Sequence, residues 1–322
     1  MKLIKERVFD SDVYVMIANE GETPLLVAGE YKQVMTVKEA ENHWMLNNGY
    51  ERVGAVNCGF FNMSTKEMLG QCLCDWSNVK MSETGWCDGI ADVAYDGSKI
   101  VVGDFATFNG MQWVRAVSWG IMKDGKEWTL GREKYSHANS RQPRTMIGKT
   151  KEGYPIVIVV DGRNMKSKLV SGAVSKGVTA SQQYQLALRY NCQDLVNADG
   201  GGSSVMEYGG NILNNPSDGG LRRCSDFVVF YRKKQPVQKP EPQPQPQKYY
   251  RIVAGSYQDY NNAKKILANI QAKGVDAFIK QVEVNGAKYY RIYCGSYSKK
   301  ENAVVQQKRL KEMGISTFLS FE

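Results

Sequence analysis

The fold of the larger part of the chain is inferred from residues 196–206, which read Val196-Asn197-Ala198-Asp199-Gly200-Gly201-Gly202-Ser203-Ser204-Val205-Met206. An apolar run, typical of a β-strand, ends in an aspartate, and three consecutive glycines follow it. Glycine takes backbone dihedrals that other residues avoid and lets the backbone approach a ligand closely. Successive N–H groups in such a turn form an anion-binding nest. We therefore predict a strand that delivers a carboxylate, free amides and two hydroxyls to one sheet edge; the alternative is a tight turn capped by an aspartate.

Four further segments place polar side chains beside apolar runs: Asn57–Asn62, Gln142–Gly148, Asp161–Arg163, and Asn214–Asp218 with Arg222 beyond it. Together with the glycine segment, this ordered set resembles the phosphodiester glycosidase family over roughly residues 10 to 231. That family includes the lysosomal uncovering enzyme, which removes N-acetylglucosamine from a sugar phosphodiester. The chain departs from the family pattern at Cys58, where glycine is usual, and at Asp226, where we expect asparagine.

The resemblance implies a hydrolase of the glycosidase type, and the residues have suitable chemistry. Arginine matches phosphate oxygens in a bidentate way, and glycosidases commonly use two carboxylates. We predict that Asp161, Asp199 and Arg144 are catalytic, with the two carboxylates facing one cleft from the ends of two strands. Which aspartate is acid, base or nucleophile stays open. The predicted substrate-binding residues are Asn57, Asn62, Thr145, Arg163, Gly200, Gly201, Gly202, Ser203, Ser204 and Arg222.

No cofactor and no metal ligand set are predicted. The two cysteines of Cys72-x-Cys74 are too close in sequence for the usual metal pair, and only His43 and His137 are available to assist them. The chain has seven cysteines at irregular spacing, which argues against a full disulfide framework and for reduced thiols. A divalent cation near Asp161 or Asp199 is compatible with the sequence, which does not require one.

The formal charge of +9 is unevenly distributed along the chain. Residues 1–231 carry a net charge of −1, residues 232–248 carry +4 and residues 249–322 carry +6. A basic tail suits a polyanionic partner such as an anionic bacterial wall, a nucleic acid or a membrane surface. Met1–Arg7 lacks the apolar core of a signal peptide, and no run approaches the length of a membrane span. We therefore expect synthesis in the cytoplasm.

Apolar alternation predicts a first strand at 12–18, and a capping box at Thr36 begins a predicted helix at 35–48. A second helix at 180–191 follows Thr179. The other predicted strands lie near 53–56, 90–95, 99–102, 114–121, 144–149, 155–160, 194–198 and 226–231. Many strands with few helices indicate an α+β fold with a mixed sheet.

The last part of the chain contains an internal repeat, because Tyr249–Tyr257 recurs as Tyr289–Tyr297. Each half reads strand, turn, helix, glycine, strand, which predicts a small two-repeat βαβ-type domain with both helices on one face. This tail resembles a SPOR domain, a family that binds peptidoglycan glycan strands stripped of their stem peptides. Alternating Pro and Gln before it favour an extended tether. The predicted division is a catalytic domain at 1–231, a Pro/Gln-rich linker at 232–248 and the SPOR-like domain at 249–322.

Exposed aromatic and polar side chains of the tail are the candidates for glycan contact, since aromatic rings stack on sugar faces. Sheets of similar architecture bind RNA through exposed aromatics, but the glycine-aromatic pattern of the RNA motif is absent, so no nucleic-acid partner is predicted. Strand alternation requires that some of the tyrosines face the helices as core. The predicted glycan-binding residues are Tyr249, Arg251, Ser256, Tyr257, Tyr289, Arg291, Ser296 and Tyr297.

The leading hypothesis is a glycosidase that degrades a bacterial wall polymer, with the tail holding it on glycan. The bond is in peptidoglycan glycan or in a sugar-phosphate polymer such as teichoic acid or its linkage unit. The modular plan suggests a phage or prophage endolysin released through holin-type membrane holes. The alternative is a non-catalytic wall- or glycan-binding protein, in which Cys58 and Asp226 mark a degenerate site. The oligomeric state has no signature in the sequence.

We expect residues 249–322 to fold alone and to bind glycan mainly through the sheet face rather than through the net charge of +6. Salt screens exposed charges beyond about 8 Å at physiological ionic strength, so a purely electrostatic binder would be released. The isolated tail should therefore stay on stripped glycan in a pull-down at raised salt. Complete loss of binding, together with equal binding to RNA, would instead indicate a general polyanion binder.

Overall fold

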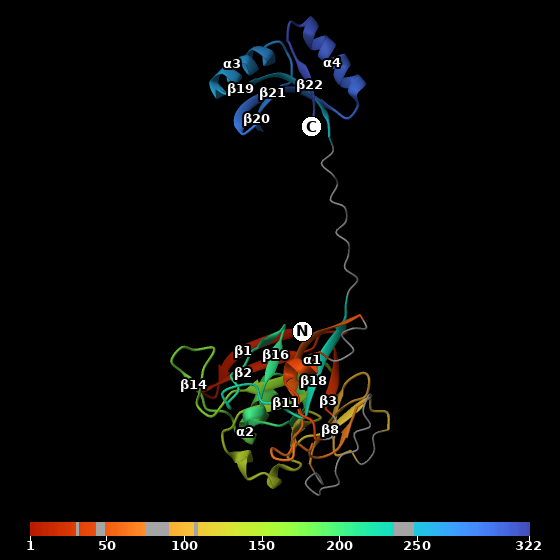
Figure 1. Cartoon of the computed structure of the whole chain (residues 1–322), viewed down its shortest axis with the longest axis vertical. Helices are drawn as coiled ribbons and strands as arrows, with labels where there is room; N and C mark the ends of the chain where they lie inside the picture. The colour runs from red at the N-terminus through yellow and green to blue at the C-terminus, as the bar shows by residue number, and fades with distance from the viewer. Residues whose placement is uncertain (30–31, 43–48, 75–89, 106–108, 235–247) are drawn as a thin grey trace. The chain divides into compact units, whose positions relative to one another are not determined.

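The structure is a computed structural model, which describes all residues except 30–31, 43–48, 75–89, 106–108 and 235–247. The chain forms two compact units, Met1–Pro236 and Val237–Glu322 (Figure 1). Most of the predicted linker at 232–248 lies outside the described residues. In the part of the chain that is described, no helix is long and apolar enough to cross a bilayer.

The larger unit contains a seven-stranded antiparallel sheet. Val160 ends one strand and pairs with Arg144, and Asn197 ends another strand and pairs with Met146. Arg144 and Met146 lie at the start of the strand between these two. Residues that follow Val160 and Asn197 therefore emerge at the same edge of the sheet. In spatial order, the strands are β1 (Lys2–Val8), β2 (Ser11–Ile17), β12 (Pro155–Val160), β11 (Arg144–Thr150), β15 (Cys192–Asn197), β9 (Trp119–Lys123) and β10 (Lys126–Glu127).

Two smaller antiparallel sheets and a short ribbon complete the larger unit. The five-stranded sheet contains, in order, β17 (Asn211–Ile212), β16 (Met206–Tyr208), β4 (Tyr50–Asn57), β18 (Asp226–Lys233) and β3 (Thr23–Ala28). The four-stranded sheet contains β5 (Cys72–Leu73), β8 (Trp113–Ala116), β6 (Asp92–Tyr95) and β7 (Ile100–Gly103). The ribbon pairs β13 (Met165–Lys166) with β14 (Val174–Ser175).

The main core of the larger unit lies between these sheets, where buried side chains from all three pack together. Members of this cluster include Val157 and Val196 of the seven-stranded sheet, Val228 of the five-stranded sheet and Trp113 of the four-stranded sheet. Helix α2 (Ala180–Arg189) packs on the outer face of the seven-stranded sheet, and α1 (Val37–Glu41) on that of the five-stranded sheet. Among the described residues, short 3₁₀ helices lie in connections: η2 (Arg132–Lys134), η3 (Ser136–Asn139) and η4 (Gly201–Ser203).

The predicted α+β class is confirmed, and the described strand pairs are antiparallel where we expected a mixed sheet. The capping boxes at Thr36 and Thr179 are both present. Helix α1 ends at Glu41, whereas the prediction extended to 48, and residues 43–48 lie outside the described part.

The single strand predicted at 114–121 is wrong, because the chain changes sheets within it. The Val117 amide donates to Ala91, and the next amide, of Ser118, donates to Asn197 on β15. The alternation shifts by one residue at Ala116 and Val117, but apolar residues continue on both sides of this joint, so the segment was predicted as one strand.

The smaller unit forms one antiparallel sheet in the order β20-β21-β19-β22, with both helices contributing to one core. The repeat is visible in the packing, because Ala263 and Ala303 occupy equivalent helix positions and are both fully buried. Its elements are β19 (Tyr250–Tyr257), α3 (Tyr260–Gln271), β20 (Phe278–Val284), β21 (Ala287–Tyr297), α4 (Lys300–Glu312) and β22 (Phe318–Phe321).

A buried carboxyl pair lies where α1 packs on the five-stranded sheet. Glu41 of α1 and Glu207 of β16 are both almost fully buried. Burial, with a hydrogen bond to Glu207 and its charge, raises the pKa of Glu41 to about 9, against the opposing charges of Arg52 and Lys38. Glu41 therefore keeps its proton at neutral pH.

We expect Glu41 to make the larger unit less stable as the pH rises from about 4.5 to about 9. The folded pKa of Glu41 lies above its unfolded value, so its contribution is fully present below about pH 4.5 and is lost as the pH rises through about 9. The loss is at most about 1.4 kcal/mol per pH unit. In urea unfolding between pH 5 and 9, the free energy of unfolding should fall with pH at up to this rate, and Glu41→Gln should reduce the slope. The exposed Glu20→Gln is the control; an unchanged slope in Glu41→Gln would contradict the assignment.

Candidate active site

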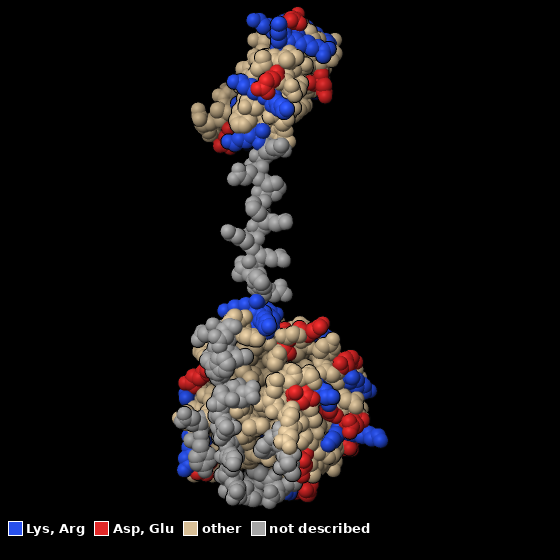
Figure 2. Space-filling view, turned by 90° about the vertical axis from the view of Figure 1, so that its right-hand side faces the viewer, with Lys and Arg blue, Asp and Glu red and all other residues tan. Residues whose placement is uncertain are grey.

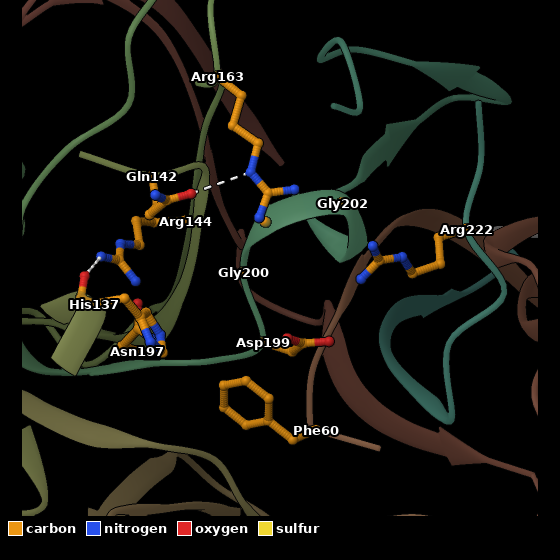
Figure 3. A pocket seen from close by; sticks show the side chains of 11 residues that line it. Phe60, His137, Gln142, Arg144, Arg163, Asn197, Asp199, Gly200, Gly202 and Arg222 are labelled. Atoms are coloured by element: carbon orange, nitrogen blue, oxygen red, sulfur yellow. Dashed lines mark hydrogen bonds between the residues drawn. The ribbon is translucent and has the colours of Figure 1, made fainter. Parts of the chain in front are cut away.

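Polar residues line a cavity of about 310 Å³ at the edge where β12 and β15 end and β11 begins. This volume is in the range of small-ligand pockets, which begin at about 300 Å³. Six separate segments contribute side chains, so the pocket exists only in the folded unit. Its lining residues are Phe60, His137, Gln142, Arg144, Arg163, Asn197, Asp199, Gly200, Gly201, Gly202 and Arg222 (Figure 3).

The glycine turn forms the centre of this pocket and follows β15 directly. The Asp199 amide donates to the carbonyl of Cys58 at 2.8 Å, and the Gly201 amide donates to that of Pro143 at 3.0 Å. Gly201 has a φ of +61°, which other residues rarely adopt. A Cβ on Gly202 would lie 2.1 Å from the carboxylate of Asp218. The glycines are therefore required because other groups approach the turn so closely.

Asp199 is the acidic residue of the pocket lining, and only 8% of it is exposed. Burial raises its pKa to about 7, although a hydrogen bond from Ser203 and the charge of Arg222 oppose the shift. The Ser203 hydroxyl also accepts a hydrogen bond from Arg222 Nη1 at 3.0 Å. A carboxyl group that titrates near neutrality is suited to proton transfer or nucleophilic attack at physiological pH.

Three arginines approach the glycine turn from different elements (Figure 3). Arg144, the first residue of β11, is 2% exposed; its Nη2 donates to the carbonyls of His137 (2.8 Å) and Ser140 (3.0 Å). Its guanidinium also lies 5.0 Å from the ring centroid of Trp119. Burial and the nearby charge of Arg163 lower the pKa of Arg144 to about 10. The cavity therefore has an excess of positive charge and favours an anionic ligand.

Arg163 and Arg222 complete this set from loops, and Arg163 has a positive φ of 54°. Arg163 Nε donates to Gln142 Oε1 at 3.1 Å, which holds one side of the guanidinium against the β11 entry. Arg222 is held by Ser203 and by an ion pair with Asp218. Both guanidinium groups therefore lie beside the amides of the glycine turn.

A phosphodiester glycosidase family model matches residues 50–231, more than half of the chain. The chain belongs to the phosphodiester glycosidase family. A SPOR-domain model matches residues 246–320, so the predicted combination of the two domains is confirmed. A SPOR domain implies peptidoglycan binding.

Known proteins similar to this chain include one from a prophage. The SPbeta prophage-derived uncharacterized protein YomE of Bacillus subtilis (strain 168) is 32% identical over 133 residues, which are 41% of this chain and 19% of that protein. The zebrafish N-acetylglucosamine-1-phosphodiester alpha-N-acetylglucosaminidase catalytic domain, auto-inhibited by its pro-peptide, shares the fold with a TM-score of 0.51 and 16% identity, over 73% of this chain and 82% of that one. A hypothetical protein from Synechocystis has a TM-score of 0.50 and 12% identity, over 71% of this chain and 61% of that one.

Two residues predicted to bind substrate in this glycosidase domain lie behind the pocket instead of lining it. Asn57 Nδ2 donates to the Asp199 carbonyl at 2.7 Å, and Asn57 Oδ1 accepts from Thr145 Oγ1 at 2.8 Å and from the Val205 amide at 3.1 Å. Both side chains are buried. The pair therefore fixes the two ends of the glycine turn.

Asp161 lies at the same sheet edge as Asp199 but does not line the pocket. Burial raises its pKa to about 7, against hydrogen bonds from Asn214 Nδ2 (3.1 Å) and the Asn215 amide (3.0 Å) to its Oδ1. These bonds hold the loop that carries Asp218. Asn62 is also outside the lining, where its Oδ1 accepts from the amides of Ser64 and Thr65. The catalytic and binding roles of both residues stay predictions.

The two serines after the glycines differ in their surroundings, although both are 1% exposed. Ser203 lies between Asp199 and Arg222 and contacts both. The Ser204 hydroxyl has no hydrogen-bond partner among the described residues. Of the two, Ser203 is the one placed to orient the pocket's charged groups.

Phe60, His137, Gln142 and Asn197 line the pocket and were not among the predicted site residues. His137 lies on η3, and burial with the charges of Arg144 and Arg163 lowers its pKa. Phe60 and Gln142 fall within motifs that the sequence had already marked, whereas His137 stands outside every motif. The described residues contain no group of three or more His, Cys, Asp or Glu side chains placed to hold a metal ion.

The two departures from the family pattern are internal. Cys58 is fully buried, and Asp226 forms a fully buried ion pair with Arg115 at 3.0 Å. The Gly59 amide donates to Asp226 Oδ1 at 2.6 Å. Although burial opposes it, the charge of Asp226 raises the pKa of Arg115. The carboxylate of Asp226 therefore compensates the buried positive charge of Arg115.

The SPOR domain presents part of the predicted glycan-binding set on its helix-free face. Because Ile252 and Ile292 face the helix-side core, alternation places Arg251 and Arg291 on the opposite face. Arg251 lies 5.5 Å from the ring centroid of Tyr293, which stacks on Phe278 with centroids 5.5 Å apart. Basic and acidic side chains are interspersed over the visible surface of this domain (Figure 2).

The remaining predicted glycan-binding residues of the SPOR domain divide between this face and the core. Arg291 Nε donates to Ser256 Oγ at 3.2 Å, the Tyr289 hydroxyl accepts from Gln258, and Tyr249 lies near Arg251. Ser296 is exposed and pairs in register with Arg251. Tyr257 and Tyr297 instead pack against the helix-side core. Their roles in glycan binding stay predictions.

We expect Asp226→Asn to destabilise the larger unit strongly although it restores the residue usual for the family. The change keeps the shape but leaves the buried charge of Arg115 without its partner, which costs about 3–5 kcal/mol. Urea unfolding of the full chain measures the loss. The matched control is Asp124→Asn on the exposed β9–β10 turn, which should change stability by less than about 0.5 kcal/mol. Equal stability of the two variants would show that the pair is not needed.

Proposed function

We propose that the protein is a glycosidase that cleaves a sugar bond beside an anionic, phosphate-type group of a bacterial wall polymer. The observation that carries the proposal is the buried Asp199, whose pKa is raised to about 7, beside three arginines on a glycine turn. Anion recognition by arginine and backbone amides is the chemistry that a sugar phosphodiester requires. Family membership supports the reaction class.

In the proposed reaction, the anionic group binds between Arg163, Arg222 and the amides of the glycine turn. Phe60, which stacks on Tyr135 with centroids 6.1 Å apart, offers a ring face to the sugar. As general base, Asp199 takes a proton from the water that attacks the anomeric carbon; as nucleophile, it attacks this carbon itself and water then hydrolyses the sugar–enzyme ester. In both cases the C–O bond to phosphate breaks and the phosphate leaves with its electron pair. A phosphate leaving group needs little protonation, so a second carboxylic acid is not required in the pocket. Arg144 stabilises the negative charge that develops as the bond breaks.

The proposed substrate is a wall polymer with sugar-phosphate links, such as teichoic acid or its linkage unit, and plain peptidoglycan glycan is the second choice. The SPOR domain supports a wall location. Similarity to a protein named as derived from the SPbeta prophage supports a phage or prophage endolysin. We propose that such an enzyme is made in the cytoplasm and reaches the wall after holin-type release.

We expect purified walls that carry teichoic acid to release phosphosugar or new reducing ends when they are incubated with the full chain. Asp199→Asn should abolish this release, because the variant can neither take a proton nor attack. If Asp199 is base or nucleophile, the rate of the unaltered protein should rise with pH through about 7.

The exposed Asp124→Asn should act on walls like the unaltered protein. A rate that falls through pH 7 would make Asp199 the acid. Absence of any released fragment from every wall type, with wall binding retained, would replace the enzyme by a non-catalytic wall-binding protein.

A further inference from the structure

The loop from Asn214 to Arg222 crosses the glycine turn and is fixed at its base. Asn214 is fully buried; its Nδ2 donates to Asp161 Oδ1 at 3.1 Å and to the Ser204 carbonyl at 2.9 Å, and its Oδ1 accepts from the Met206 amide. The tip is different. Residues 218–221 are exposed, Gly219 has a φ of +78°, and a Cβ on Gly219 or Gly220 would meet only open space.

The carboxylate of Asp218 at this tip lies where the anion-binding groups of the pocket converge. It accepts from Arg222 Nε at 2.9 Å and lies 3.6 Å from Arg163 Nη1, and its Oδ1 is 2.1 Å from the Cβ position of Gly202. Two pocket arginines and the glycine turn therefore surround one carboxylate that belongs to the chain itself. That side chain is 36% exposed, so it can leave without disturbing the core.

We propose that Asp218 occupies the position of the substrate's anionic group and is displaced when substrate binds. This inference rests on the proposed function, in which the pocket takes a phosphate-type group. A carboxylate and a phosphate present similar oxygens to arginine, and both form bidentate contacts with it. A phosphodiester, like a carboxylate, carries one negative charge on two non-bridging oxygens, so it can take over the contacts of Asp218 with both arginines. A neutral sugar offers no such replacement.

Asp218 therefore sets specificity and also compensates part of the positive charge of the pocket. With Asp218 in place, the charges of Arg163 and Arg222 are partly compensated while no substrate is present. A ligand must carry negative charge to recover the ion pairs that it breaks. The open tip at Gly219 and Gly220 allows the carboxylate to swing away while Asn214 keeps the base in place. The competing explanation is that Asp218 stays bound and merely positions Arg222.

The test is a calorimetric titration of the full chain with inorganic phosphate at fixed salt, which needs no knowledge of the natural substrate. Asp218→Asn removes the competing charge and retains the shape, so phosphate affinity should rise about three- to tenfold, the range expected for releasing partly exposed ion pairs. Asp218→Ala should show the same gain. The exposed Asp124→Asn should leave the affinity unchanged. Unchanged or weaker phosphate binding in both Asp218 variants would overturn the proposal in favour of a positioning role.

A double variant shows whether the gain arises at this site. Adding Arg222→Gln to Asp218→Asn should return phosphate affinity to the level of the unaltered protein or below it; a gain that persists would place the phosphate elsewhere and overturn the proposal. The result is separable from the proposed function. Tighter phosphate binding by the Asp218 variants without wall cleavage by the unaltered protein would support the Asp218 inference and reject the enzymatic function. Wall cleavage without tighter phosphate binding would support the enzymatic function and reject the Asp218 inference.

Discussion

The buried ion pair between Arg115 and Asp226 connects the two smaller sheets of the larger unit and holds the segment that carries Phe60 to the pocket. Arg115 on β8 of the four-stranded sheet reaches Asp226 on β18 of the five-stranded sheet, and its Nη2 donates to the Phe60 carbonyl at 2.8 Å. A Cβ on Gly59 would fall 2.1 Å from the guanidinium, so glycine is needed there. Because the Cys58 carbonyl accepts the Asp199 amide, the same short segment joins the ion pair to the pocket carboxylate. Moving this pair would move Phe60 and Asp199 together.

Two buried carboxyl groups at one sheet edge have similar pKa values and different surroundings. Burial raises the pKa of both Asp161 and Asp199 to about 7. The oxygens of Asp161 accept hydrogen bonds from Asn214 and Asn215, so they are occupied in holding a loop. Asp199 faces the cavity beside Arg222. The raised pKa alone therefore does not distinguish a reacting group from a structural one; access to the cavity does.

The sequence was enough to predict the strand ends and the glycine turn, because both depend on local patterns of apolar and small residues. It could not tell which way a polar side chain beside a strand end points. Asn57 and Thr145 have the same sequence pattern as pocket residues but face inward to hold the turn. His137 lies outside every motif, and only the packing of η3 brings it to the pocket.

In the tail, the repeated Gly-Ser-Tyr has a structural reason that the repeat itself could not reveal. A Cβ on Gly255 would lie 2.5 Å from the Tyr257 hydroxyl, and a Cβ on Gly295 would lie 2.8 Å from the ring carbon Cε2 of Tyr297. Each glycine thus makes room for the ring two residues later, and both rings join the helix-side core. The repeated tyrosines therefore close the core of each half, and this leaves the opposite face of the sheet, which carries Arg251 and its repeat equivalent Arg291, without helices over it.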